Sequence, residues 1–188
     1  MKKLIVQYLT KCALCALAVF AVTFFTGSAF KLPQGAYINI GDSVIYVIAL
    51  LFPLGVSLPA AVAGAALADV AIGSTNYVIA TIVIKALMVV AVKCVIRLSD
   101  KVLTQDLFVC LTGVFTVAGY FVADIILTVK DGIGFVKALS TRALEGTMPN
   151  VLQALVCAVI YLAISGVARR IAAKKQKTET ETETEVSI

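Results

Sequence analysis

Residues 77–92 read Tyr77-Val-Ile-Ala-Thr-Ile-Val-Ile-Lys85-Ala-Leu-Met-Val-Val-Ala-Val92, an apolar run with one lysine at its centre. An ammonium group in the middle of a membrane-spanning helix costs about 2.5–3.5 kcal/mol on insertion scales, so such a lysine predicts a functional site. A second interpretation is that the Lys85 side chain reaches the membrane interface. Lys85 is roughly 12 Å of helix from either end at about 1.5 Å per residue, which favours the site.

The composition of the whole chain indicates a membrane protein. Hydrophobic residues make up 61% of the 188 residues and charged residues 14%, and the mean hydropathy is +1.01. Soluble domains usually contain about 25% charged residues, so we expect an integral membrane protein without a separate soluble domain. The net charge of +5 comes from basic residues that flank apolar segments, which indicates membrane topology and not nucleic-acid binding.

Six apolar segments predict an all-α integral membrane protein with six transmembrane helices. They are residues 4–25, 44–56, 58–72, 77–96, 107–129 and 151–168. The second and third are short, and the Pro/Gly cluster between them, residues 52–59, predicts a tight turn. The first resembles a secretory signal peptide, but it is long enough to span the membrane, so we expect a retained helix.

The chain is expected to divide into a six-helix membrane domain, residues 1–173, and a disordered cytoplasmic tail, residues 174–188. The tail alternates Thr and Glu and has no apolar face. With both termini inside, the inner segments hold eleven Lys and Arg residues and the outer segments four. The positive-inside rule therefore predicts an N-in, C-in protein of the cytoplasmic membrane.

Several kinds of chemistry lack their residues here. The five cysteines, among them the pair Cys12-x-x-Cys15, lie in apolar runs of a chain without histidine, so we expect apolar packing and neither metal nor redox chemistry. There is no phosphate-binding loop and no G-x-S-x-G motif, and without histidine a serine hydrolase would lack its base. We expect no cofactor, no metal and no enzymatic activity.

The polar residues of the predicted helices gather in the outer half of the membrane. They are Asn39, Asp42, Asp69, Lys85, Tyr120, Asp124, Asn150 and Gln153. The inner halves carry no comparable groups, which predicts a binding cavity open to the outside and not a relay through the membrane. The alternative is that each group lies near a membrane interface, where a polar side chain costs little free energy. Residues 26–41 and 130–149 are long outer connections that would cap the pocket.

The first predicted helix is rich in small side chains, with Cys12 and Ala16 four residues apart. Small residues at this spacing let two helices approach closely in lipid. This face would contact either the other helices of the chain or a membrane partner.

Five short motifs occur in a fixed order along the predicted helices: Asn39-Ile-Gly41-Asp42, Ala68-Asp69, Ile84-Lys85-Ala-Leu-Met, Gly119-Tyr120-Phe121 with Asp124, and Asn150-Val-Leu-Gln153-Ala. In this order they resemble the substrate-binding S components of energy-coupling factor (ECF) vitamin transporters. The likeness covers residues 4–168 and is closest to the branch for riboflavin, hydroxymethylpyrimidine or vitamin B6 compounds.

The resemblance implies a protein that captures a small heteroaromatic vitamin from outside for ATP-driven uptake by partner subunits. Those partners would be a transmembrane coupling protein, which docks on the first helix at Cys12 and Ala16, and two ATPase subunits. The implied ligand residues are Asn39, Asp42, Lys85, Tyr120, Asp124, Asn150 and Gln153, with Asp69 as a weaker candidate. The family usually has glutamate where this chain has the shorter Asp124.

The resemblance also suggests partners for Lys85. Its ammonium group would pair with Asp69 or Asp124, or donate directly to a ligand oxygen. Two other functions are open: a self-sufficient small transporter in which Lys85 and Asp124 handle protons, and a membrane assembly or interaction protein without a small ligand.

Overall fold

The structure, a computed structural model, describes residues 2–32 and 37–186, and most of this part of the chain is helical. No strand occurs in that part, where Lys31 and Tyr37 form one isolated bridge, so the predicted all-α class is confirmed. The elements are α1 (Lys2–Ala29), α2 (Gly41–Leu51), α3 (Leu54–Ile72), the 3-10 turn η2 (Thr75–Tyr77), α4 (Val78–Leu98), α5 (Val102–Leu111), α6 (Val114–Lys130), α7 (Phe135–Lys137), the π-helical η3 (Ala138–Ala143) and α8 (Leu144–Val186).

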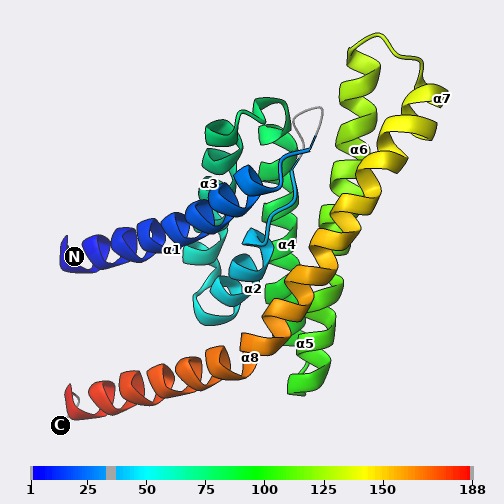
Figure 1. Ribbon diagram of the computed structural model, residues 1–188. Helices are drawn as coiled ribbons and strands as arrows, with labels where there is room; N and C mark the ends of the chain where they lie inside the picture. Colours follow the sequence, from blue (N-terminus) through cyan, green and yellow to red (C-terminus); the bar gives the residue numbers. More distant parts are fainter. Residues whose placement is uncertain (1, 33–36, 187–188) are drawn as a thin grey trace.

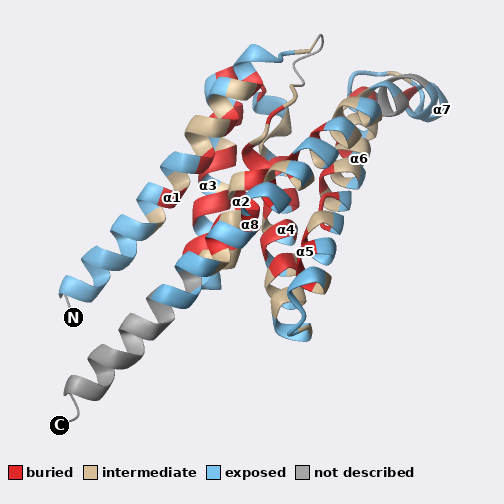
Figure 2. Cartoon of the chain, turned by 60° about the horizontal axis from the view of Figure 1, so that its bottom comes forward, coloured by how far each residue is buried: buried red, intermediate tan, exposed pale blue. Residues whose placement is uncertain are grey.

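Five helical stretches of the described residues are long and apolar enough to cross a membrane: Lys3–Ala29, Leu54–Ile72, Thr75–Leu98, Val102–Lys130 and Glu145–Ile171. They agree with five of the six predicted spans. The remaining helix, α2, has 11 residues, about half of the roughly 20 that a full span needs. Six full spans are therefore not confirmed, and the N-in, C-in orientation stays a prediction, although both termini point to the same side in Figures 1 and 2.

The helices pack around a common core. In Figure 1, α1 lies along α3, and α6 and α8 run side by side, with α2 and α4 between these pairs. Buried residues concentrate on α2, α3 and α4 where the pairs meet, whereas the outer faces are exposed (Figure 2). Those exposed faces are mostly apolar, as expected of a surface that contacts lipid.

The turn between α2 and α3 is shorter than the sequence predicts. It consists of Phe52 and Pro53 alone, and α3 continues through Pro59. A proline inside a helix leaves the carbonyl four residues earlier without its usual donor. Here that carbonyl, on Gly55, accepts a hydrogen bond from the hydroxyl of Tyr8 on α1 at 2.7 Å. This contact from α1 satisfies the carbonyl that Pro59 leaves without a helical donor.

An extended segment leads into α2 from the C-terminal end of α1. Its backbone N–H groups lack helical partners, and unsatisfied groups are costly inside a membrane protein. Side chains supply acceptors: Asn39 N donates to Gln153 Oε1 at 3.0 Å, and Ile40 N donates to Thr26 Oγ1 at 3.2 Å. Gly41 N donates to Asn39 Oδ1 at 2.8 Å. The segment thus replaces the first turns of a full second span and carries Asn39 into the protein.

Helices extend into two segments that the sequence predicts to be an outer connection and a disordered tail. The outer connection at 130–149 is mostly helical, because η3 and α8 begin well before Pro149, which α8 includes; neighbouring helices allow proline in membrane helices. At the other end, α8 continues to Val186, so the helix has no break at residue 174. The disorder of the tail stays a prediction.

The small-residue face of α1 packs inside the chain. Cys12 and Ala16 are half-buried against the core, and a Cβ on Gly64 of α3 would lie 2.5 Å from the carbonyl oxygen of Ala16. The close α1–α3 contact therefore depends on glycine at position 64. Of the two expectations for this face, contact with the chain's own helices is the one that the structure shows. The predicted docking of a partner at Cys12 and Ala16 would require α1 to leave α3.

A buried polar cluster joins α5 to α8 at the end of the bundle away from η2. Asp106 forms an ion pair with Arg169 at 2.6 Å, and Tyr161 donates to the same carboxylate at 2.7 Å. Arg169 also donates to Gln105 at 2.6 Å. Polar groups are therefore also buried at this end of the bundle, away from the eight predicted site residues. Asp106 and Arg169 each lie just outside a predicted span, so their long-range pairing was not visible in the sequence.

Candidate functional site

A pocket opens among η2, α3, α6, α8 and the extended segment before α2. It encloses about 450 Å³ of atom-free space, open solvent included. Six of the eight predicted ligand residues line it: Asn39, Asp69, Tyr120, Asp124, Asn150 and Gln153. Residues from four separate parts of the sequence thus converge on one cavity, as expected from their shared depth.

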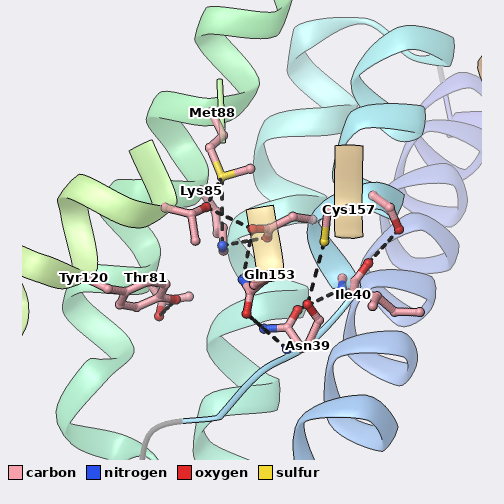
Figure 3. A network of polar contacts seen from close by, with 12 residues as sticks. Asn39, Ile40, Thr81, Lys85, Met88, Tyr120, Gln153 and Cys157 are labelled. Carbon is pink, nitrogen blue, oxygen red and sulfur yellow. Dashed lines mark hydrogen bonds and ion pairs between the residues drawn. The ribbon is translucent and has the colours of Figure 1, made fainter. Parts of the chain in front are cut away.

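Gln153 and Asn39 form the polar floor of the pocket (Figure 3). Both the backbone and the side-chain nitrogen of Asn39 donate to Gln153 Oε1, at 3.0 Å and 3.2 Å. The Cys157 thiol donates to the Asn39 carbonyl oxygen at 3.7 Å. These contacts set the orientation of the Gln153 amide, because its oxygen must face Asn39 and its nitrogen must face the other way.

The nitrogen of that amide leads to a buried charge pair beneath the floor. Gln153 Nε2 donates to Asp42 Oδ2 at 3.1 Å, and Thr116 donates to the same oxygen at 2.9 Å. The other oxygen, Asp42 Oδ1, lies 2.6 Å from Lys85 Nζ, with side chains that are 1% and 3% exposed. Asp42 and Lys85 do not line the pocket. They form the layer behind it.

The two carboxylates predicted to pair with Lys85 are therefore not its partners, and direct donation to a ligand oxygen stays a prediction. Lys85 pairs with neither Asp69 nor Asp124 but with Asp42, and its Nζ lies 5.5 Å from the centre of the Tyr120 ring. Asp42 begins α2, and the extended segment before α2 sets this short helix deep enough to reach the middle of α4. The depth predicted for each residue did not reveal this pairing. The segment before α2, which belongs to the predicted outer connection 26–41, enters the protein instead.

Two tyrosines hold the carboxylates that were expected to pair with Lys85. The hydroxyl of Tyr37 donates to Asp69 Oδ1, and that of Tyr77 donates to Asp124 Oδ1 at 2.7 Å. Burial and neighbouring carboxylates raise the pKa of the Tyr37 hydroxyl, so this group stays protonated and acts as the donor. Both tyrosines line the pocket.

Aromatic rings make up much of the remaining wall. The rings of Tyr77 and Tyr120 meet edge to face at 6.1 Å, and the Tyr120 hydroxyl shares a hydrogen bond of 2.8 Å with Thr81 (Figure 3). Such rings offer flat apolar surface together with a polar edge. A planar ligand with polar substituents suits this combination.

The sequence did not single out several residues that shape the site. Thr116 binds Asp42, and its place four residues before Tyr120 on α6 was an available signal. Gly146 faces the Asp124 carboxylate so closely that a Cβ there would collide with it. Nothing in the sequence indicated this contact, which depends on the packing of α8 against α6.

The charged residues that line the pocket in the described part of the chain are all acidic. Asp69 and Asp124 are its charged lining residues, and no lysine or arginine is among the lining residues that the structure describes. Lys85 does not change this balance, since Asp42 neutralises it in the layer below. The pocket therefore favours ligands that donate hydrogen bonds and disfavours negatively charged ones.

A second cavity is a groove between α4 and α6 with about 1,490 Å³ of atom-free space, open solvent included. Its lining residues are apolar or glycine, except for Thr75, Asn76 and Lys130. Because it lacks converging polar groups, it does not have the character of a specific site for a polar ligand. The pocket described above is the stronger candidate.

Comparison with known proteins identifies the family. No curated protein and no solved structure matches the chain. A family model does: residues 6–170 match the model described as ECF-type riboflavin transporter, S component. This match spans most of the chain, including every helix that lines the pocket, and confirms the resemblance seen in the motifs. The chain is a multi-pass membrane protein that belongs to the family of ECF-type riboflavin transporter S components.

Proposed function

We propose that this S component captures a small, planar, heteroaromatic vitamin or precursor at the pocket formed by Asn39, Asp69, Tyr120, Asp124, Asn150 and Gln153. The family description makes riboflavin the first compound to test; hydroxymethylpyrimidine and pyridoxine-like compounds are the other candidates. The observation that carries the proposal is the convergence of these six side chains with two further tyrosines on one cavity.

Binding and not catalysis is the role of this family. An S component is the substrate-binding subunit of an ECF importer, it works with the ECF module, and it is not an enzyme. In our proposal the module contains a transmembrane coupling protein and two ATPase subunits. The ligand enters from outside, and binding changes the preference of the S component for its partner-bound state.

The outward face of α1 is the proposed docking surface for the coupling protein. Cys12 and Ala16 face α3, whereas Leu14 and Leu17 on the opposite face are 61% and 59% exposed. Ala18 is also exposed on that side. A partner helix can reach these residues without displacing α1 from the bundle.

The layer of Asp42 and Lys85 has a supporting role in this proposal. The ion pair holds Gln153 through Asp42, and Gln153 in turn holds Asn39. A ligand that contacts the floor therefore meets amides whose orientation is already set. Such preorganisation increases affinity because little freedom is lost on binding.

The test is direct ligand binding by the purified protein in lipid nanodiscs. Quenching of the riboflavin fluorescence measures riboflavin binding; calorimetry serves for pyridoxine and hydroxymethylpyrimidine. We expect saturable binding of one of the three and a higher melting temperature with it. Binding of none would contradict the proposal and favour an assembly protein without a small ligand.

Reconstitution separates the proposal from a self-sufficient transporter. Proteoliposomes that contain this protein alone should bind the ligand but not accumulate it against a gradient. Concentrative uptake without any ATPase would show that the protein transports by itself.

A further inference from the structure

Asp69 has an unusual place among the pocket residues. It lies in the last turn of α3, is 1% exposed, and lines the pocket. Its Oδ1 accepts the Tyr37 hydroxyl, and the Thr81 hydroxyl also interacts with the carboxylate, but no hydrogen bond that meets the usual geometry reaches Oδ2 from the described residues. Buried carboxylate oxygens are nearly always paired, so an exception calls for an explanation.

The cations on neighbouring elements do not supply the missing partner. Lys85 forms its ion pair with Asp42, and Lys31 donates to the Ile72 carbonyl oxygen at 2.7 Å. The backbone of Asp69 has ordinary capping contacts, since its carbonyl accepts Ser74 N at 2.8 Å. The hydrogen bonding of Asp69 is therefore incomplete at one side-chain oxygen, Oδ2, in the wall of the pocket.

We infer that Asp69 is a specificity-determining residue whose Oδ2 accepts an N–H or O–H hydrogen from the bound ligand, while Tyr37 is the positioning residue that reserves Oδ1 for itself. The inference rests on the proposed function and deepens it. The ligand must carry a hydrogen-bond donor at the edge that meets α3, and a compound with a negative group at that edge is rejected. Riboflavin, pyridoxine and hydroxymethylpyrimidine all carry donors and meet the first condition.

The arrangement allows a test based on the direction of one hydrogen bond. In the Asp69→Asn variant, the Tyr37 hydroxyl still needs an acceptor and therefore holds the amide oxygen. The amide nitrogen then takes the place of Oδ2 and turns its hydrogens toward the donor of the ligand. Shape is conserved, but an acceptor has become a donor.

The expected result is a drop in ligand affinity of at least about tenfold for Asp69→Asn. The probe is riboflavin or, if it does not bind, the tightest binder of the three compounds. Adding Tyr37→Phe frees the amide to turn its oxygen to the ligand, so the double variant should recover to within about threefold of the wild type. The single variant Tyr37→Phe should lose only a few-fold, because the ring remains.

The melting temperature without ligand distinguishes binding from a structural role. Asp69→Asn keeps the Tyr37 hydrogen bond and removes a buried negative charge whose Oδ2 has no hydrogen bond, so the ligand-free variant should melt at or above the wild-type temperature. The matched control is Asp131→Asn, a change at an exposed carboxylate, which should alter neither affinity nor melting.

Each outcome decides a question. If the wild type binds but Asp69→Asn retains its affinity within about twofold, the inference is wrong while the proposed function stands. If the double variant binds as weakly as Asp69→Asn, the positioning role of Tyr37 is wrong. If the wild type binds none of the three compounds, the proposed function fails and the inference fails with it. Should Asp69→Asn not fold, Asp69→Ala is measured against the same limits.

Discussion

Lys85 on α4 and Asp42 on α2 form a 2.6 Å ion pair whose two side chains are 3% and 1% exposed. The pair lies behind the pocket floor and is tied to it by Gln153, which donates to Asp42 at 3.1 Å. The costly intramembrane lysine is thus neutralised by the protein itself before any ligand arrives. In our proposal the pair supports the pocket, and direct contact with the ligand is left to the residues above it.

Breaking this pair from one side should destabilise the protein strongly. Lys85→Met or Asp42→Asn alone leaves a buried charge without its partner, and we expect each to lower the unfolding free energy by about 3–5 kcal/mol. The double variant should lose clearly less than the sum of the two. Thermal unfolding in detergent measures this, with Lys130→Met, a change at an exposed lysine, as control. Additive losses would show that the pair does not act as a unit.

Gln153 should matter for both stability and binding. Gln153→Met keeps the length of the side chain but leaves the Asn39 N–H and the Asp42 carboxylate each without one partner. We expect a loss of about 1–3 kcal/mol in stability and at least about tenfold in ligand affinity. Melting curves and titrations of the same preparation measure both. The exposed Gln7→Met is the matched control, and unchanged affinity in Gln153→Met would remove Gln153 from the site.

The two faces of α1 should respond differently to the same substitution. Ala16→Phe forces a large ring into the close contact with Gly64 of α3, so we expect a loss of stability and of ligand binding together. Ala18→Phe lies on the exposed face and should leave ligand binding intact while weakening co-purification with the coupling protein. If Ala18→Phe co-purifies normally, the proposed docking face is wrong.

The orientation of the chain can be read by cysteine labelling. In a variant with all five native cysteines replaced by alanine or serine, Gly132→Cys places a thiol in the turn between α6 and α7, and Ser99→Cys places one between α4 and α5. The N-in, C-in prediction requires that a membrane-impermeant maleimide label Gly132→Cys in intact cells. Ser99→Cys should react only after permeabilisation. The reverse pattern would invert the topology and place the pocket on the inner side.

The cluster at the other end of the bundle offers a neighbouring pair of arginines for comparison. Arg169→Leu removes the partner of the largely buried Asp106 and Gln105, so the melting temperature should fall, corresponding to about 1–3 kcal/mol. Arg170→Leu changes the exposed neighbour on the same helix and should have almost no effect. Ligand affinity, measured below the melting point, should be equal in both. Equal melting of the two variants would show that the cluster contributes nothing.

Much of the fold follows from properties that are local in the sequence. Hydropathy and helix length depend on consecutive residues, so five of the predicted spans, including 77–96 and 151–168, reappear as α4 and within α8. The short α2 does not follow, because its first turns are replaced by an extended segment whose N–H groups bind Gln153 and Thr26. Acceptors on distant helices decided that exchange.

The sequence by itself determined the membrane class of this protein, its family, and the set of polar residues that meet at one depth, because apolar runs and the spacing of polar residues along them are linear properties. Only the tertiary structure decided which groups pair: Lys85 with Asp42, Tyr37 with Asp69, and Cys12 and Ala16 with the core that α3 helps to form. The physical reason is that hydrogen bonds and ion pairs act over a few ångströms, a distance that the packing of helices sets and sequence separation does not.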